Sequence, residues 1–176
     1  ADQITVPSKE MFQEYVKNGY KVSYVPNAID ISSFSHDKDR RYEKQLIFAG
    51  RLSKEKGILN LLNFLKILSK DIHLIILGSG PEESKVKDMT RTFPNLHFLG
   101  YQSKENTIKL IRGSDILIQP SIMEGGTSST LLEAMACKIP IIATSVDGNK
   151  DTIIHMKTAY VVSSNNPSEI HNAVNY

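Results

Sequence analysis

The stretch from Pro120 to Thr144, PSIMEGGTSSTLLEAMACKIPIIAT, constrains the fold of this chain more than any other. The apolar segments DILIQPS at its start and PIIAT at its end are typical of buried strands, whereas LLEAMAC between them has the pattern of a helix. This order predicts a βαβ unit, in which the loop from Glu124 to Thr130 joins the carboxyl end of a strand to the amino terminus of a helix. Free N–H groups and the positive end of the helix dipole meet there, so we predict a site for a phosphate-bearing ligand.

Short apolar segments alternate with helical ones along the rest of the chain. Ser8 suits an N-cap position before KEMFQEYVK, and Gly19 follows the expected end of that helix. The strands are apolar on both faces, which favours an α/β fold with a parallel sheet covered by helices on both sides. We expect strands in ITVPS, KVSYV, QLIFAG, HLIILG, LHFLG, DILIQP, PIIAT and AYVV, and further helices in GILNLLNFLKILS and near residues 81–92, 104–113 and 129–138.

Composition narrows the functional classes. The 176 residues suffice for one well-buried core, and the net charge of +2, with scattered basic residues, does not indicate a nucleic-acid partner. Cys137 is the only cysteine, so no internal disulfide can form, which is compatible with a reducing cytosol. No apolar run approaches the roughly 20 residues of a membrane helix, and ADQITVPSKE lacks the pattern of a signal peptide. We therefore expect a single cytoplasmic domain.

Two acids, Glu124 and Glu133, flank the loop and the helix start. The stretch EGGTSSTLLE resembles the signature of family 4 (group 1) glycosyltransferases, retaining nucleotide-sugar enzymes of the GT-B fold, whose motif is Glu, seven residues and Glu. Here eight residues separate the acids, and we expect the loop to absorb the extra one without moving the helix. MACKIP carries Lys138 where the family usually has a helix-ending glycine. The resemblance implies that Glu124 holds the donor sugar and diphosphate and that Glu133 takes the ribose hydroxyls. It also implies donor contacts by Gly125, Gly126, Thr127, Ser128, Ser129, Thr130 and Leu131.

Other segments extend the resemblance over nearly the whole chain. FAGRLSKEKG, residues 48–57, is similar to the family's strand-to-helix loop, which implies that Arg51 and Lys56 grip the diphosphate. VPNAIDISSF, residues 25–34, is similar to the segment that enters the donor domain, with Ala28 where glycine is usual. LGSGPEE and FLGYQSKE resemble the two loops beside the nucleotide base, which implies base-side contacts by Gly78, Gly80, Tyr101 and Gln102.

The resemblance implies a Rossmann-like sheet that forms one half of a GT-B enzyme. Residues 1–176 would be the donor-binding domain, and ADQITVPSKE is similar to the approach from an amino-terminal acceptor domain, so we expect the chain to be part of a larger enzyme. The chain would bind a nucleotide diphosphate sugar but transfer nothing alone. The full enzyme would move a hexose with retention to a hydroxyl of a glycan, a lipid-linked or another acceptor, and the missing domain could contact a membrane peripherally.

The predicted site residues also have simpler interpretations. TLLE, which ends at Glu133, matches a capping box, in which the carboxylate caps its own helix. Glu124 could be a solvated loop acid, and Arg51 and Lys56 lie in RLSKEK, a charged loop of a kind that is usually solvated. The family spacing favours ligand roles for Arg51 and Lys56. The planar guanidinium of Arg51 suits paired hydrogen bonds to a phosphate, and the ammonium group of Lys56 adds a point charge. Lys54 is expected to face solvent.

The remaining polar motifs do not indicate a metal or a separate cofactor. Gly78 and Gly80 lack the third glycine of a dinucleotide fingerprint, because Glu83 stands in its place. Asp37 and Asp39 form an Asp-x-Asp pair, but no apolar strand leads into it, and the five histidines have no ligand spacing. We expect no metal and no cofactor beyond the nucleotide-sugar substrate.

Two functional classes fit these features. In the first, the chain is the donor half of a retaining glycosyltransferase, and Arg51, Lys56 and the helix that starts near Thr130 stabilise the departing diphosphate. In the second, it is a non-catalytic GT-B-like nucleotide-binding or scaffold module, or a related phosphorylase or epimerase. The acidic residues Glu124 and Glu133 and the basic residues Arg51 and Lys56 favour the first class. The base, the sugar, the acceptor and the oligomeric state do not follow from the sequence.

Overall fold

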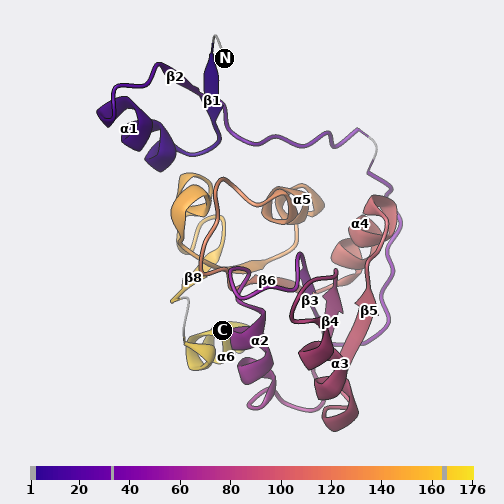
Figure 1. Ribbon diagram of the computed structural model, residues 1–176. Helices are drawn as coiled ribbons and strands as arrows, with labels where there is room; N and C mark the ends of the chain where they lie inside the picture. The colour runs from indigo at the N-terminus through magenta and orange to yellow at the C-terminus, as the bar shows by residue number, and fades with distance from the viewer. Residues whose placement is uncertain (1–2, 33, 164–165) are drawn as a thin grey trace.

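The computed structural model describes residues 3–32, 34–163 and 166–176, which form two separate parallel sheets (Figure 1). The Ala-Asp pair at the start of the chain and Ser33 of the segment entering the domain lie outside the described residues. The main sheet has six strands in the order β5-β4-β3-β6-β7-β8, and every neighbouring pair is parallel. Its strands are β3 (Gln45–Ala49), β4 (His73–Leu77), β5 (Leu96–Gly100), β6 (Ile116–Gln119), β7 (Ile141–Thr144) and β8 (Tyr160–Val162).

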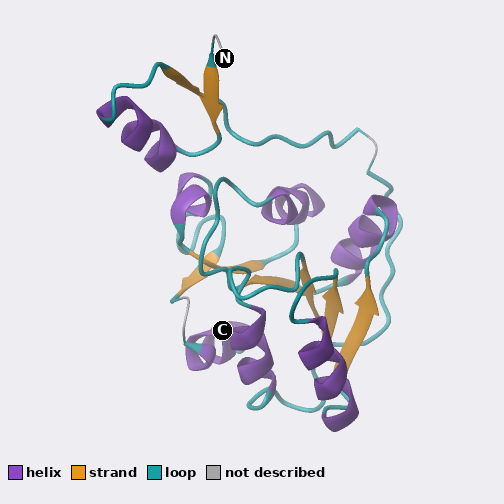
Figure 2. Ribbon diagram, in the orientation of Figure 1, coloured by secondary structure: helices purple, strands orange, loops and turns teal. Residues whose placement is uncertain are grey.

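Helices cover both faces of the main sheet (Figure 2). Leu46 and Phe48 of β3 pack in one hydrophobic cluster, while Ile47 and Ala49 of the same strand pack in the other. Burial of successive side chains on opposite faces explains why these strands are apolar throughout, and it confirms the predicted α/β fold. One face carries α2 (Ile58–Leu65), α3 (Glu83–Thr92) and α6 (Pro167–Val174), and the other carries α4 (Lys104–Gly113) and α5 (Ser129–Cys137).

Two helix ends lie where the sequence predicts them, and a third does not. The Ser8 hydroxyl accepts a hydrogen bond from the Met11 N–H at 3.2 Å and caps α1 (Lys9–Lys17), as predicted. Lys138 ends α5 in the left-handed conformation, with φ of 59°, where glycine would be more comfortable. By contrast, α2 ends one turn before Leu68, although the apolar pattern continues and Leu68 still packs in the core. Within the described residues, no helix has the length and apolar character needed to cross a membrane.

A small unit of β1 (Ile4–Val6), α1 and β2 (Val22–Tyr24) stands apart from the main sheet (Figure 1). Residues 34–44 pass along α4, where the Asp39 N–H donates to the Lys109 carbonyl at 2.9 Å, and then enter β3 (Figure 1). The unit contacts the main body at the short 3-10 helix η1 (Asp147–Asp151). There the Lys9 N–H donates to the Asp151 carboxylate at 2.9 Å.

The order in which the chain adds strands to the sheet reverses between β3 and β6, which are parallel neighbours in the centre of the sheet. From β3 the chain proceeds outward through β4 and β5, and from β6 it proceeds the other way through β7 and β8. The loops after β3 and β6 meet closely, because a Cβ atom on Gly57 would lie 1.8 Å from the Pro120 carbonyl oxygen. Such a switch point at the carboxyl ends of the strands is where open α/β sheets bind ligands.

Candidate functional site

Two cavities of about 530 and 330 Å³ lie side by side at this switch point. Both are lined by Ala49 and Gly50 at the end of β3, by Arg51, and by Thr130 in the first turn of α5. They therefore form one continuous site. The larger cavity is also lined by Leu77, Gly78, Ser79, Gly80, Tyr101, Gln102 and Thr107, and the smaller by Asn27, Lys56, Gln119, Glu124, Gly126, Thr127, Ser128 and Ser129.

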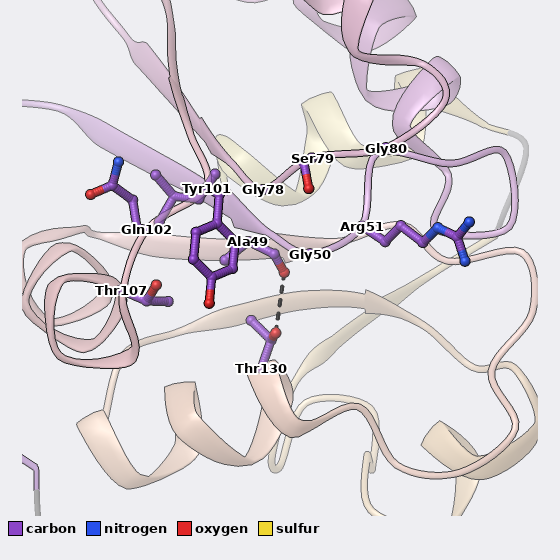
Figure 3. Close-up of a pocket in the computed structure, with 11 residues that line it drawn as sticks. Ala49, Gly50, Arg51, Gly78, Ser79, Gly80, Tyr101, Gln102, Thr107 and Thr130 are labelled. Carbon is purple, nitrogen blue, oxygen red and sulfur yellow. Dashed lines mark hydrogen bonds between the residues drawn. The ribbon is translucent and has the colours of Figure 1, made fainter.

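The larger cavity brings together the four residues predicted beside a nucleotide base: Gly78, Gly80, Tyr101 and Gln102 (Figure 3). Gln102 and Tyr101 lie at one end of this cavity, and Arg51 lies at the other. Tyr101 is 79% exposed, so its ring offers a flat apolar surface to the cavity. The Gln102 amide donates to the Leu99 carbonyl at 2.7 Å, which fixes the side chain.

The start of α5 presents two backbone donors to the site, at Ser129 and Thr130. The Thr130 hydroxyl donates to the Ala49 carbonyl at 3.1 Å and ties the helix start to β3 (Figure 3). The Ser128 N–H donates to Asn149 Oδ1, and the Leu131 N–H donates to the Ser128 carbonyl. Among the described residues, nothing accepts from the N–H groups of Ser129 and Thr130. With the helix dipole behind them, these donors suit an anion.

Side chains distant in sequence hold the loop before α5. The Thr127 hydroxyl donates to the Gly148 carbonyl at 2.9 Å, while its own carbonyl accepts from Asn27 Nδ2 at 2.8 Å. Asn149, which is fully buried, accepts from the Ser128 N–H at 3.2 Å. Sequence reasoning missed both asparagines. The segment VPNAID was a signal for Asn27, but its contact reaches across 100 residues of chain.

Glu124 and Lys56 form an ion pair inside the smaller cavity. Glu124 Oε2 accepts from Lys56 Nζ at 2.6 Å, and Oε1 accepts from Ser121 Oγ at 2.7 Å and Gln119 Nε2 at 3.3 Å. The side chain of Glu124 is 5% exposed and that of Lys56 is 27% exposed. The interpretation of Glu124 as a solvated loop acid is therefore wrong. Arg51 is exposed at the junction of the cavities, with no ion-pair partner in the described part of the chain, and Lys54 lines neither cavity.

Three predicted site residues lie outside both linings: Glu133, Leu131 and Gly125. Glu133 lies one turn after Thr130, on the same side of α5, and is half-buried. Burial raises the pKa of its carboxyl above the ordinary value, and the charge of Lys104 partly opposes this. The capping-box interpretation is wrong, because the helix starts after Ser128 and Glu133 makes no hydrogen bond to any described residue. The Leu131 side chain is buried in the core.

Asp37 and Asp39, the Asp-x-Asp pair of the linker, both have protein partners. Asp39 pairs with Arg41 at 2.8 Å, and Asp37 lies 3.4 Å from Lys109. Over residues 3–32, 34–163 and 166–176, no three histidine, cysteine, aspartate or glutamate side chains gather in a way that could hold a metal ion. The cavities themselves present Arg51, Lys56 and backbone N–H donors, which suit recognition of an anion.

Comparison with known proteins gives a family match over most of the chain. A model of the family Glycosyl transferases group 1 matches residues 28–176. An uncharacterized glycosyltransferase of Methanocaldococcus jannaschii is 32% identical over 136 residues, which are 74% of this chain and 35% of the relative. The N-acetyl-alpha-D-glucosaminyl L-malate synthase of Bacillus anthracis is 35% identical over 127 residues, which are 68% of this chain and 32% of the relative. The chain thus spans about a third of the length of these relatives.

Solved structures share the fold at low sequence identity. The superposition on Anabaena HepE in complex with UDP and glucose covers 99% of this chain and 53% of the HepE chain, with a TM-score of 0.84 and 18% sequence identity. The superposition on HepE in complex with UDP-glucose covers the same fractions of the two chains, with a TM-score of 0.83 and 16% sequence identity. These likenesses support the Rossmann-like half of a GT-B architecture.

Proposed function

Because the chain belongs to the glycosyl transferases group 1 family, we propose that its joined cavities bind a nucleotide diphosphate sugar. The base occupies the larger cavity beside Tyr101 and Gln102, the diphosphate lies where the cavities meet, and the sugar extends into the smaller cavity toward Glu124. One observation carries the proposal: exposed Arg51 and Thr130 line both cavities and Ser129 lines the smaller one, and the N–H groups of Ser129 and Thr130 have no acceptor among the described residues.

The same groups suit the chemistry of transfer. When the bond from the sugar to the diphosphate breaks, negative charge develops on the departing diphosphate. Arg51 offers two parallel N–H donors, Lys56 adds a mobile charge, and the α5 dipole points its positive end at the same place. Donors that are already oriented toward a developing charge stabilise the transition state with little reorganisation. We therefore assign Arg51, Lys56 and Glu124 catalytic roles.

The donor in this proposal is a UDP-sugar, because HepE, which shares the fold, is solved with UDP and with UDP-glucose. The acceptor is a hydroxyl of a glycan, a lipid-linked or another molecule, and transfer proceeds with retention. Since the chain spans about half of HepE and about a third of its curated relatives, we propose that the acceptor side lies outside these residues. The chain alone then binds donor without transferring it.

A thermal-shift panel tests the proposed donor class. UDP, GDP and ADP are each added in the presence of EDTA, with uridine as the control that lacks phosphate. A ligand at ten times its Kd stabilises a protein by about 1.4 kcal/mol, which raises the Tm of a domain of this size by about 3 to 6 °C. We expect this shift with UDP and little with uridine. Absence of a shift with all three diphosphates at millimolar concentration would refute nucleotide binding.

A further inference from the structure

Lys56, a proposed diphosphate ligand, is already paired with Glu124 in the smaller cavity. We propose that Glu124 is a resident counterion of Lys56, which the diphosphate of the donor displaces. The inference rests on the proposed function, since it concerns the same site. It assigns Glu124 a second role, that of an internal anion that competes with the ligand for Lys56.

The two carboxylate oxygens of Glu124 are held in different ways. Oε1 accepts from Ser121 Oγ and Gln119 Nε2, and both of these side chains are fully buried. Ser121 is itself fixed, because its carbonyl accepts from the Thr144 hydroxyl at 2.5 Å. Oε2, in contrast, has Lys56 Nζ as its only hydrogen-bond donor among the described residues. Departure of Lys56 therefore leaves the carboxylate anchored through Oε1 while Oε2 becomes free.

Lys56 is accessible from the cavity, as this exchange requires. Its side chain is 27% exposed and lines the cavity next to Arg51, whereas Glu124 is 5% exposed and cannot follow it. The flexible four-carbon stem of lysine allows the ammonium group to turn toward a phosphate. A diphosphate at the junction carries more charge than one carboxylate and also meets Arg51 and the backbone donors of α5. It is therefore the stronger competitor for Lys56.

The exchange links diphosphate binding to recognition of the sugar. A buried carboxylate that has lost its cation needs new hydrogen-bond donors, since an unpaired buried charge is unfavourable. The hydroxyls of a sugar in the smaller cavity supply such donors at Oε2. Glu124 is thus available to the sugar once the diphosphate has drawn Lys56 away.

Titration calorimetry of UDP against Glu124→Gln tests the competition. The glutamine side chain keeps the size of the glutamate but removes the charge that holds Lys56. We expect UDP to bind the variant about three- to tenfold more tightly than the wild type, in line with the loss of a partly exposed ion pair. Binding of uridine, which has no phosphate, should stay unchanged. Melting followed by circular dichroism confirms that both proteins are folded.

Glu124→Asp separates competition from simple charge repulsion. Aspartate keeps the negative charge but is one methylene shorter, so it holds Lys56 less well, and competition predicts tighter UDP binding here too. Equal or weaker UDP binding by folded Glu124→Gln would overturn the exchange, as would a gain in Glu124→Gln with none in Glu124→Asp. Failure of the wild-type chain to bind UDP at all would instead contradict the proposed function.

Discussion

Glu133 is a half-buried carboxylate of α5, one turn after the cavity-lining Thr130, and its proposed ligand is the ribose of the nucleotide. Glu133→Gln should weaken UDP binding but leave the binding of a 2′,3′-dideoxy analogue nearly unchanged, because the analogue has no hydroxyls to lose. Titration calorimetry of both ligands against both proteins measures this difference. Equal losses for the two ligands would remove Glu133 from the ribose site.

The raised pKa of the Glu133 carboxyl gives a second readout for the same variant. A carboxyl whose pKa is raised on folding stabilises the fold below its unfolded pKa, and this contribution is lost as pH rises through the folded pKa. At pH 7, above the unfolded pKa, the burial of the Glu133 carboxyl therefore lowers the stability of the fold, and glutamine removes this cost. We expect the Tm of Glu133→Gln at pH 7 to equal or exceed that of the wild type. A lowered Tm would contradict this account of burial.

His97 lies at the opposite end of the sheet from the cavities and makes stability depend on pH. Its Nε2 lies 2.9 Å from His73 Nδ1, its Nδ1 lies 3.0 Å from the Tyr42 hydroxyl, and the Tyr42 ring stacks on both imidazoles. Burial lowers the pKa of His97, and the charges of His73 and Arg41 lower it further. The folded state thus binds fewer protons than the unfolded state as pH falls below about 6.5.

The predicted outcome is a loss of stability in mild acid that requires His97. Urea unfolding at pH 7.5 and pH 5.5 should give a smaller unfolding free energy at the lower pH in the wild type. In His97→Gln the difference between the two pH values should shrink, because the group that titrates has been removed. An unchanged difference would show that other groups cause the acid sensitivity.

Single residues divide into those that the sequence could predict and those that it could not. Arg51 and the base-side residues Gly78, Gly80, Tyr101 and Gln102 follow the ends of neighbouring strands, so the predicted parallel sheet already brings them to one edge. The partners of Glu124 could not be predicted in this way, because hydrogen bonding by Ser121 and Gln119 depends on side-chain orientation inside a folded loop. The binding roles of these residues remain predictions.

At the scale of elements, Gly57 controls how the loops after β3 and β6 meet. It has a φ of +71°, and a Cβ atom there would lie 1.8 Å from the Pro120 carbonyl oxygen. Gly57→Ala should lower the unfolding free energy by about 2 to 4 kcal/mol, because strain at positive φ adds to the collision. Urea denaturation followed by circular dichroism measures the loss.

Gly19 provides the matched control for Gly57. Its φ is +81°, but a Cβ atom there would meet nothing within 4 Å. Gly19→Ala should therefore cost about 1 kcal/mol, the strain alone. Losses of equal size in the two variants would show that the close contact between the loops does not matter for stability.

The elements themselves were largely predictable from the sequence. Apolar runs bounded by glycine, proline and polar residues marked the strands of the main sheet, because both faces of that sheet are buried. The separation of β1, α1 and β2 from that sheet was not predictable. These elements show the same local patterns as the others, and strand pairing depends on contacts between segments distant in sequence.

At the scale of the whole molecule, the proposal divides the work of transfer between this chain and residues beyond it. The chain should bind a UDP-sugar without transferring the sugar, and a protein with the full length of its relatives should transfer it. In that longer protein, Glu124→Gln should lower kcat although it tightens UDP binding, because its sugar contact forms where charge develops as the bond breaks. Steady-state kinetics of both proteins measure this. Robust transfer by the 176 residues alone would contradict the division.

In the proposed function, Arg51 and the start of α5 bind the diphosphate of a nucleotide without a metal. Titration calorimetry of UDP in EDTA tests it most directly on the wild type, Arg51→Ala and Lys54→Ala, since Lys54 lies in the same loop but outside both cavities. We predict that Arg51→Ala loses about 1.5 to 3 kcal/mol of binding free energy, the usual contribution of a charge-assisted hydrogen bond, and that Lys54→Ala loses almost none. Equal UDP affinity in the wild type and Arg51→Ala would contradict this proposal.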